Sequence, residues 1–97
     1  LGKKSNLNMT KVLDAISGGA AQSWQMDNRF KTMVNGEFDF GFAVDLMIKD
    51  IKIALDHSKD LGIKLPSTKS ILQNYKKLST LGDGQLDTSS LIKLLEY

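Results

Sequence analysis

The most strongly periodic stretch of the chain is Ala43–Leu61, which reads AVDLMIKDIKIALDHSKDL. Successive residues of an α-helix are rotated by about 100°, and at that spacing the apolar residues gather on one broad face. The residues of this face are Val44, Met47, Ile48, Ile51, Ala54, Leu55 and Ser58. Leu46 and Ile53 lie on the other side, beyond a stripe of charged residues. The pattern predicts a long helix, ended by Gly62, with neighbours on more than one side.

The N-terminal part of the chain carries two shorter helical patterns. Asn8 is placed to cap a short helix, which the pair Gly18-Gly19 ends. Ala20–Val34 predicts a second helix, and the uneven spacing of its large apolar residues indicates a kink near Asp27-Asn28. Residues 37–42 alternate apolar and polar side chains, but the chain has no second strand pattern to pair with them. An extended loop is therefore favoured there over a strand.

The C-terminal part predicts two more helices. Pro66 opens the first, because proline is tolerated in the first turn of a helix, and the glycines at 82 and 84 end it. Asp87 is placed to cap the last helix, Thr88–Leu95. The residues expected to face the core are Ile71, Leu72, Tyr75 and Leu78 in the first helix and Leu91, Ile92 and Leu95 in the last. The whole pattern predicts an all-α fold, a compact bundle of about five helices around the long central helix.

The composition of the chain excludes several classes of protein. Its 97 residues are the size of one domain, and 41% hydrophobic with 25% charged residues is typical of a globular protein. The absence of cysteine excludes a disulfide scaffold and a thiolate metal site, and the single histidine excludes a pair of histidine ligands. A net charge of +2 gives no electrostatic case for a nucleic-acid partner, so Lys69, Lys76 and Lys77 are interpreted as the solvated side of a helix. No apolar run reaches the length of a membrane span.

Three side chains could have functional chemistry: His57, Ser23 and Trp24. His57 could act as a general base, and the alternative is a partly buried or surface histidine of the long helix, which is favoured. Trp24, with Ser23 before it, either packs in the core or lines a binding site. Core packing is the favoured interpretation of Trp24.

Two neighbouring charged residues of the long helix differ in where they point. Lys49 lies on the charged stripe one turn after Asp45, and the two are predicted to form an ordinary i, i+4 ion pair. Asp50 points about 100° away, toward Leu46 and Ile53, where a carboxylate costs desolvation energy unless it is hydrogen-bonded. A structural bond to another helix is therefore favoured for Asp50 over a functional site.

The run GFAVDLMIKDIKIAL at residues 41–55 resembles the central helix of a known domain. This is the C-terminal domain of the β-hydroxyacid dehydrogenase family, which includes 3-hydroxyisobutyrate dehydrogenases, tartronate semialdehyde reductases and the more distant 6-phosphogluconate dehydrogenases. The flanks agree, with SGGAA at 17–21, LGIKLP at 61–66, GDG at 82–84 and DTS at 87–89. Two positions depart from the pattern, since Asn6 stands where a glycine cap is usual and Asp83 where histidine is common.

The resemblance implies that residues 1–97 form a single helical domain, like the C-terminal domain of 6-phosphogluconate dehydrogenase. An N-terminal Rossmann domain and an interdomain helix with the catalytic lysine would lie outside this chain, so no catalytic residue is expected within it. By the same resemblance, Lys49 reaches the cofactor and Phe42 lies near the nicotinamide pocket. Ser23 and Trp24 are implied to line the substrate pocket. The cofactor of the full-length protein would be NAD or NADP, with none expected on this chain alone.

The leading hypothesis is therefore an NAD(P)-dependent dehydrogenase that transfers hydride between a 3-hydroxyacid and its semialdehyde. This chain would provide substrate binding and dimerisation, and would be inactive alone. Its expected partners are its own Rossmann domain, a small hydroxyacid and further copies of itself in a homodimer or higher homo-oligomer. Nucleic acid, a membrane and a metal are not expected. The expected location is the cytoplasm or, in a eukaryote, the mitochondrial matrix. The alternative is a free-standing helical protein-interaction module without a cofactor, and a G-x-G-x-x-G motif upstream would favour the enzyme.

Overall fold

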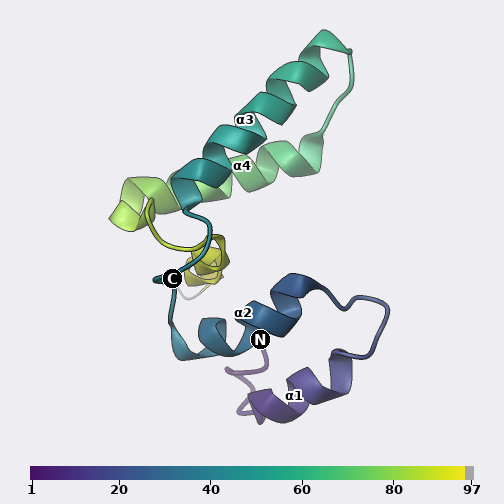
Figure 1. Ribbon diagram of the computed structural model, residues 1–97, viewed down its shortest axis with the longest axis vertical. Helices are drawn as coiled ribbons and strands as arrows, with labels where there is room; N and C mark the ends of the chain where they lie inside the picture. Colours follow the sequence, from purple (N-terminus) through teal and green to yellow (C-terminus); the bar gives the residue numbers. More distant parts are fainter. Residues whose placement is uncertain (96–97) are drawn as a thin grey trace. The chain divides into compact units, whose positions relative to one another are not determined.

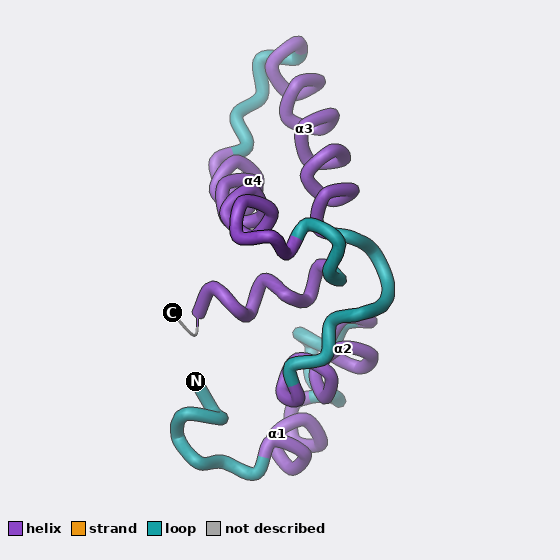
Figure 2. Tube along the Cα trace, turned by 90° about the vertical axis from the view of Figure 1, so that its left-hand side faces the viewer, coloured by secondary structure: helices purple, strands orange, loops and turns teal. Residues whose placement is uncertain are grey.

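The computed structural model describes residues 1–95, and the chain divides into two compact units, residues 1–38 and residues from Asp39 onward. The elements are the helices α1 (Met9–Ile16), α2 (Trp24–Asn35), α3 (Val44–Asp60) and α4 (Pro66–Leu78), the π-helical turn η1 (Ser79–Asp83) and the 3₁₀ helix η2 (Thr88–Leu95) (Figures 1 and 2). Residues 1–95 contain no β-strand, and their only bridge pairs Ala43 with Asp87. The predicted all-α class and the predicted loop at 37–42 are thereby confirmed.

The first unit holds α1 and α2, and each is capped by the side chain before it. Asn8 accepts a hydrogen bond from the Lys11 N–H at 3.1 Å, so the predicted cap of α1 is confirmed. Ser23 caps α2 in the same way, accepting from the Met26 N–H at 3.1 Å. Because Ser23 supplies this cap, α2 begins at Trp24, and the predicted start at Ala20 is wrong.

Helix α2 runs without interruption to Asn35, so the kink predicted near Asp27-Asn28 is also wrong. The prediction counted Trp24 among the buried residues, but that side chain is 60% exposed. The remaining large apolar residues of α2 are half-buried and follow the i, i+4, i+7, i+8 spacing of one straight stripe: Met26, Phe30, Met33 and Val34.

Asn6, one of the two residues that depart from the family's pattern, lies in the first unit. Asn6 has a φ of 56°, in the left-handed region that glycine adopts most easily. Asparagine is the residue that best tolerates this conformation after glycine. Asn6 therefore adopts the left-handed backbone that the usual glycine would adopt at this position.

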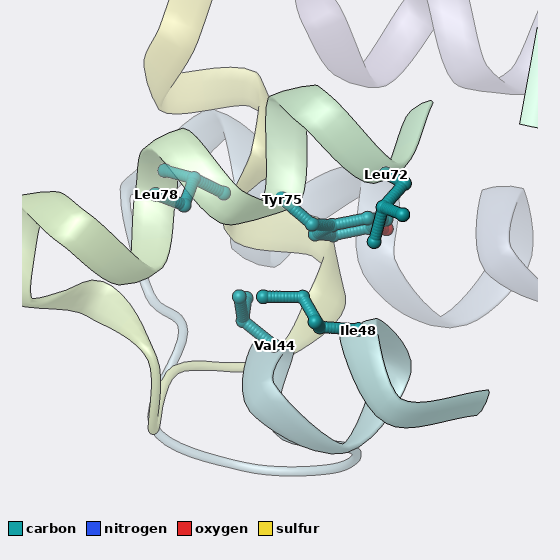
Figure 3. Close-up of a cluster of buried hydrophobic side chains, with 5 residues drawn as sticks. All are labelled: Val44, Ile48, Leu72, Tyr75 and Leu78. Carbon is teal, nitrogen blue, oxygen red and sulfur yellow. The ribbon is translucent and has the colours of Figure 1, made fainter. Parts of the chain in front are cut away.

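The second unit is built on the hairpin of α3 and α4, whose facing side chains form its core (Figure 3). The buried members of this core are Val44, Ile48, Leu72, Tyr75 and Leu78, as the sequence pattern predicted. Ile71 was predicted to join them but is 40% exposed. The buried residues of α4 follow a narrow i, i+3, i+6 line, which leaves Ile71 at its edge.

The last helix buries a different leucine from the predicted one. Leu95 is 82% exposed, whereas Leu91 and Leu94 pack against the core. The prediction assumed α-helical spacing, but η2 is a 3₁₀ helix with three residues per turn, which brings i and i+3 onto one face. Leu94 therefore takes the place that was predicted for Leu95.

The N-terminus of α3 is capped by a distant part of the chain. Ala43 precedes the helix and offers no side-chain acceptor. The Val44 N–H donates instead to the carbonyl oxygen of Leu86, at 2.9 Å. The Asp45 N–H donates to the carbonyl oxygen of Gly84, also at 2.9 Å. These two bonds satisfy N–H groups that a helix cannot pair internally, and they fix residues 84–86 beside the start of α3.

Candidate functional site

Lys49 projects into solvent from a firmly anchored part of α3. Its side chain is 63% exposed, while Val44 and Ile48 on the other face are buried at 0% and 9% exposure. The Lys49 Nζ lies 3.4 Å from Asp50 Oδ1, so the ion pair predicted with Asp45 is wrong. The contact with Asp50 is exposed on both sides and contributes little to stability, which leaves the ammonium available to an oxygen-rich ligand.

Asp45 has a structural role that replaces the predicted pair. Its Oδ1 accepts a hydrogen bond from the Ser79 hydroxyl at 2.6 Å, and its Oδ2 accepts one from the Gln85 amide at 3.5 Å. A Cβ at Gly84 would overlap the Asp45 carboxylate, so this position has no room for a side chain. Asp45 therefore ties the first turn of α3 to the turn that follows α4.

Asp50 does not make the buried helix-to-helix bond that was predicted for it. Its side chain is 52% exposed and pairs with the neighbouring Lys49. The prediction assumed that Leu46 and Ile53, on the same side of α3, were covered, but they are 46% and 61% exposed. A carboxylate on this face keeps its water, so it needs no buried partner.

Phe42 is held by its backbone, while its side chain is 39% exposed. Its N–H donates to Asp87 Oδ1 at 3.1 Å, and its carbonyl oxygen accepts from the Thr88 N–H at 2.9 Å. Asp87 is 2% exposed and also accepts from the Ser89 N–H at 3.0 Å, which confirms the predicted cap of the last helix. The link between Asp87 and Phe42 was missed, because no local pattern signals a bond across 45 positions.

Tyr75 contacts the start of η2 beside Asp87 and has a perturbed pKa. Its hydroxyl donates to the carbonyl oxygen of Thr88 at 3.3 Å. Burial raises the pKa of Tyr75 above its ordinary value of 10.0, and the negative charge of Asp87 raises it further. The phenol is therefore neutral at physiological pH and serves as a fixed hydrogen-bond donor to the start of η2.

Ser23 and Trp24 lie in the first unit, whereas Phe42 and Lys49 lie in the second. The Ser23 hydroxyl is engaged as the cap of α2. The favoured prediction of a core Trp24 is wrong: its ring is exposed, and the Arg29 guanidinium lies 4.9 Å from the ring centroid. Such a cation–π pair orients the indole at the surface of the unit.

The one histidine of the chain lies within the described residues, 1–95. His57 lies in the last turn of α3 and is exposed, as the surface interpretation predicted. In this described part of the chain, no group of three or more His, Cys, Asp or Glu side chains is arranged to hold a metal ion. No helix within the same residues combines the length and the apolar character that a membrane span requires.

Comparison with known protein families identifies the family to which this helical chain belongs. Residues 1–95 match the family model described as "NAD-binding of NADP-dependent 3-hydroxyisobutyrate dehydrogenase". The chain belongs to this family. The resemblance that the run at residues 41–55 suggested is thereby confirmed over the whole described chain.

Individual relatives agree with the family. An uncharacterized oxidoreductase of Shewanella frigidimarina is 48% identical over 94 residues, which are 97% of this chain and 32% of that protein. The probable 3-hydroxyisobutyrate dehydrogenase-like 1, mitochondrial, of Arabidopsis thaliana is 37% identical over 96% of this chain and 28% of its own length. The crystal structure of 3-hydroxyisobutyrate dehydrogenase from Salmonella typhimurium matches with a TM-score of 0.84 and 28% identity, over 96% of this chain and 33% of that one. The chain thus spans about a third of the length of the relatives that it matches.

Proposed function

We propose that the full-length protein is an NAD(P)-dependent oxidoreductase that transfers hydride between a 3-hydroxyacid and its semialdehyde. In this proposal the chain is the C-terminal domain, which contributes to substrate binding and dimerisation and works with an N-terminal Rossmann domain. The observation that carries the proposal is the family match over residues 1–95. The names of the relatives, among them an L-threonate dehydrogenase of Escherichia coli at 29% identity, support an oxidoreductase.

Lys49 is proposed to hold the cofactor. An ammonium offers three donors and a full positive charge to hydroxyl, amide or phosphate oxygens, which are the groups that a dinucleotide presents. The exposure of the Lys49 side chain and the burial of Val44 and Ile48 behind it support this role, since the backbone is fixed while the ammonium is free to approach a ligand. The nicotinamide supplies the hydride chemistry when it is bound, and Lys49 would orient it.

Phe42 is proposed to contact the nicotinamide end of the cofactor. Its ring is partly exposed, and its backbone is fixed by Asp87 and Thr88, so the ring would present an apolar surface without a loss of backbone freedom on binding. Ser23 and Trp24 are proposed to line the substrate pocket. The exposed indole supports that assignment, since it offers an aromatic surface to a small hydroxyacid.

The test of the cofactor role is the steady-state kinetics of Lys49→Ala in the full-length protein. Loss of one charged hydrogen bond would lower kcat/KM for the cofactor by about ten- to a hundredfold, from ~1.5–3 kcal/mol of binding energy. The free energy of unfolding should stay within about 0.5 kcal/mol of the wild type, because the pair with Asp50 is exposed. The 97-residue chain alone is expected to show no dehydrogenase activity.

Two matched variants serve as controls. Asp50→Ala removes the partner of Lys49 without removing the ammonium, and Lys77→Ala removes another exposed lysine of the same unit. Both are expected to keep the wild-type kcat/KM. If Lys49→Ala also keeps it, or if Asp50→Ala falls as far, the ammonium of Lys49 does not hold the cofactor.

Self-association is proposed to use the uncovered side of α3. Leu46 and Ile53 lie seven residues apart on this side and are 46% and 61% exposed. A helix that presents apolar side chains two turns apart is suited to pack against another helix. Sedimentation equilibrium of Leu46→Ser/Ile53→Ser in the full-length protein should show a weaker dimer than the wild type. An unchanged association constant would remove these two residues from the interface.

A further inference from the structure

A groove lies between the second half of α3 and the facing side of α4, and its lining includes neither Lys49 nor Phe42. Its volume is about 650 Å³, within the range of ligand sites. The floor is apolar and includes Leu55 of α3 and Leu72 of α4. Ile63 and Leu65, from the loop between the helices, close one end and are 54% and 37% exposed. These side chains leave an apolar strip open to solvent.

Lysines line both sides of the groove. Lys52 and Lys59 belong to α3, Lys69 and Lys76 to α4, and Lys64 to the loop. Asp56 is the one acidic residue in the lining, and it already pairs with Lys59 at 3.3 Å. Five lysines against one aspartate give the groove a charge of +4, although the whole chain carries only +2. The excess positive charge of the chain is thus concentrated along this strip.

The four lysines on the two helices are spaced in a heptad pattern. The pair on α3 and the pair on α4 are each seven residues apart, which is about 10.5 Å along a helix axis. All four side chains are exposed. They form two parallel rows that flank the apolar floor, as charged e and g positions flank the apolar seam of a coiled coil.

We propose that this groove binds an acidic amphipathic helix. Such a helix would place its apolar face on the floor at Leu55 and Leu72 and its acidic residues against the two rows of lysines. The charge is spread over two rows and does not converge on one point, which favours a partner with several carboxylates over an amphiphile with a single anionic head group. The lining has no arginine and no aromatic residue, and its floor is apolar, which disfavours a nucleic acid.

The probe for this surface is a fluorescein-labelled synthetic peptide of about three heptads, with Leu at the a and d positions and Glu at e and g. The repulsion between its own glutamates keeps the peptide from pairing with itself. Fluorescence anisotropy would measure its affinity for the full-length protein. We expect binding that weakens as the salt concentration rises, because exposed ion pairs are screened. The same peptide with Lys in place of Glu, or with Ser in place of Leu, should bind at least about tenfold more weakly.

The protein variants separate the groove from general charge effects. Lys52→Glu/Lys69→Glu reverses one lysine in each row and should weaken binding about tenfold or more. Lys4→Glu/Lys77→Glu changes the net charge equally but alters two lysines outside the groove, and should change affinity less than about twofold. Lys64→Glu/Lys76→Glu provides a second groove variant in case the first perturbs folding, which circular dichroism would detect.

Three results would overturn the proposal. The first is that the acidic peptide does not bind, or that its affinity falls equally in the groove variants and in the matched variant. The second is a double-stranded oligonucleotide that binds the same groove as tightly as the peptide. The third is full competition by dodecyl phosphate at a similar concentration, which would assign the groove to a single-headed amphiphile. None of these outcomes depends on Lys49 or Phe42, so the proposed cofactor role stands or falls separately.

Discussion

Replacing Asp87 by alanine tests whether one buried carboxylate holds the start of α3 and the start of η2 together. The carboxylate is 2% exposed and accepts from the Phe42 N–H at 3.1 Å, from the Ser89 N–H at 3.0 Å and from the Ser89 hydroxyl. A hydrogen bond to a charged group contributes about 1.5–3 kcal/mol, and a buried donor left without an acceptor costs about 1–3 kcal/mol. Phe42 is partly exposed and can recover water, whereas Ser89 is buried and cannot. We therefore expect Asp87→Ala to lower the free energy of unfolding by about 3 kcal/mol.

The assay is urea unfolding of the 97-residue chain, followed by far-ultraviolet circular dichroism. Asp87→Asn is the matched control, because its amide oxygen still caps η2 while its amide nitrogen cannot accept the remaining bonds. The free energy of unfolding of Asp87→Asn should be about 1–2 kcal/mol below that of the wild type, roughly half the decrease expected for Asp87→Ala. A loss below about 1 kcal/mol for Asp87→Ala, or equal losses for the two variants, would refute the reasoning.

Two further predictions concern the same unit. The pKa of Tyr75 is raised in the folded state, so its contribution to stability is complete below pH ~10 and is lost as the pH rises through the folded value. The melting temperature of the wild type should therefore fall between pH ~9 and ~11, and that of Tyr75→Phe should fall less. Parallel curves of melting temperature against pH for the two proteins would contradict this. Gly84→Ala should destabilise the chain by about 1–3 kcal/mol, because the added Cβ overlaps the Asp45 carboxylate. The loss should be smaller when Asp45→Ala is already present, and additive losses in this double-mutant cycle would mean that the two side chains do not collide.

Much of the fold could be predicted from local patterns. The burial of Val44, Ile48, Leu72 and Tyr75 follows from helical spacing alone, and the caps by Asn8 and Asp87 follow from the preference of these residue types for helix starts. The errors have local causes too. The predicted burial of Leu95 rests on α-helical spacing, whereas the last helix is a 3₁₀ helix. Helix α2 starts later than predicted because Ser23 caps it.

The candidate site was predictable only in part. The exposure of Lys49 follows from its place on the charged stripe of α3. The partner of Asp45 could not be found, because helical spacing favours Lys49 while the actual donor, Ser79, lies 34 positions away. The fixation of Phe42 by Asp87 spans 45 positions and depends equally on the tertiary fold. Contacts of this range leave no periodic trace in a single sequence.

The order in which the second unit folds should follow from the way α3 is capped. The hairpin of α3 and α4 closes a loop of a few residues, whereas the bonds from residues 42–45 to residues 84–88 close a loop of about forty. The longer closure costs about 2 kcal/mol more in chain entropy, so the hairpin should form first and the segment at 84–88 should dock afterwards. In native-state hydrogen exchange, the amides of Val44 and Thr88 should then open before those in the middle of α3, although both residues are buried. The backbone of Phe42 would accordingly be fixed last during folding and released first during partial unfolding.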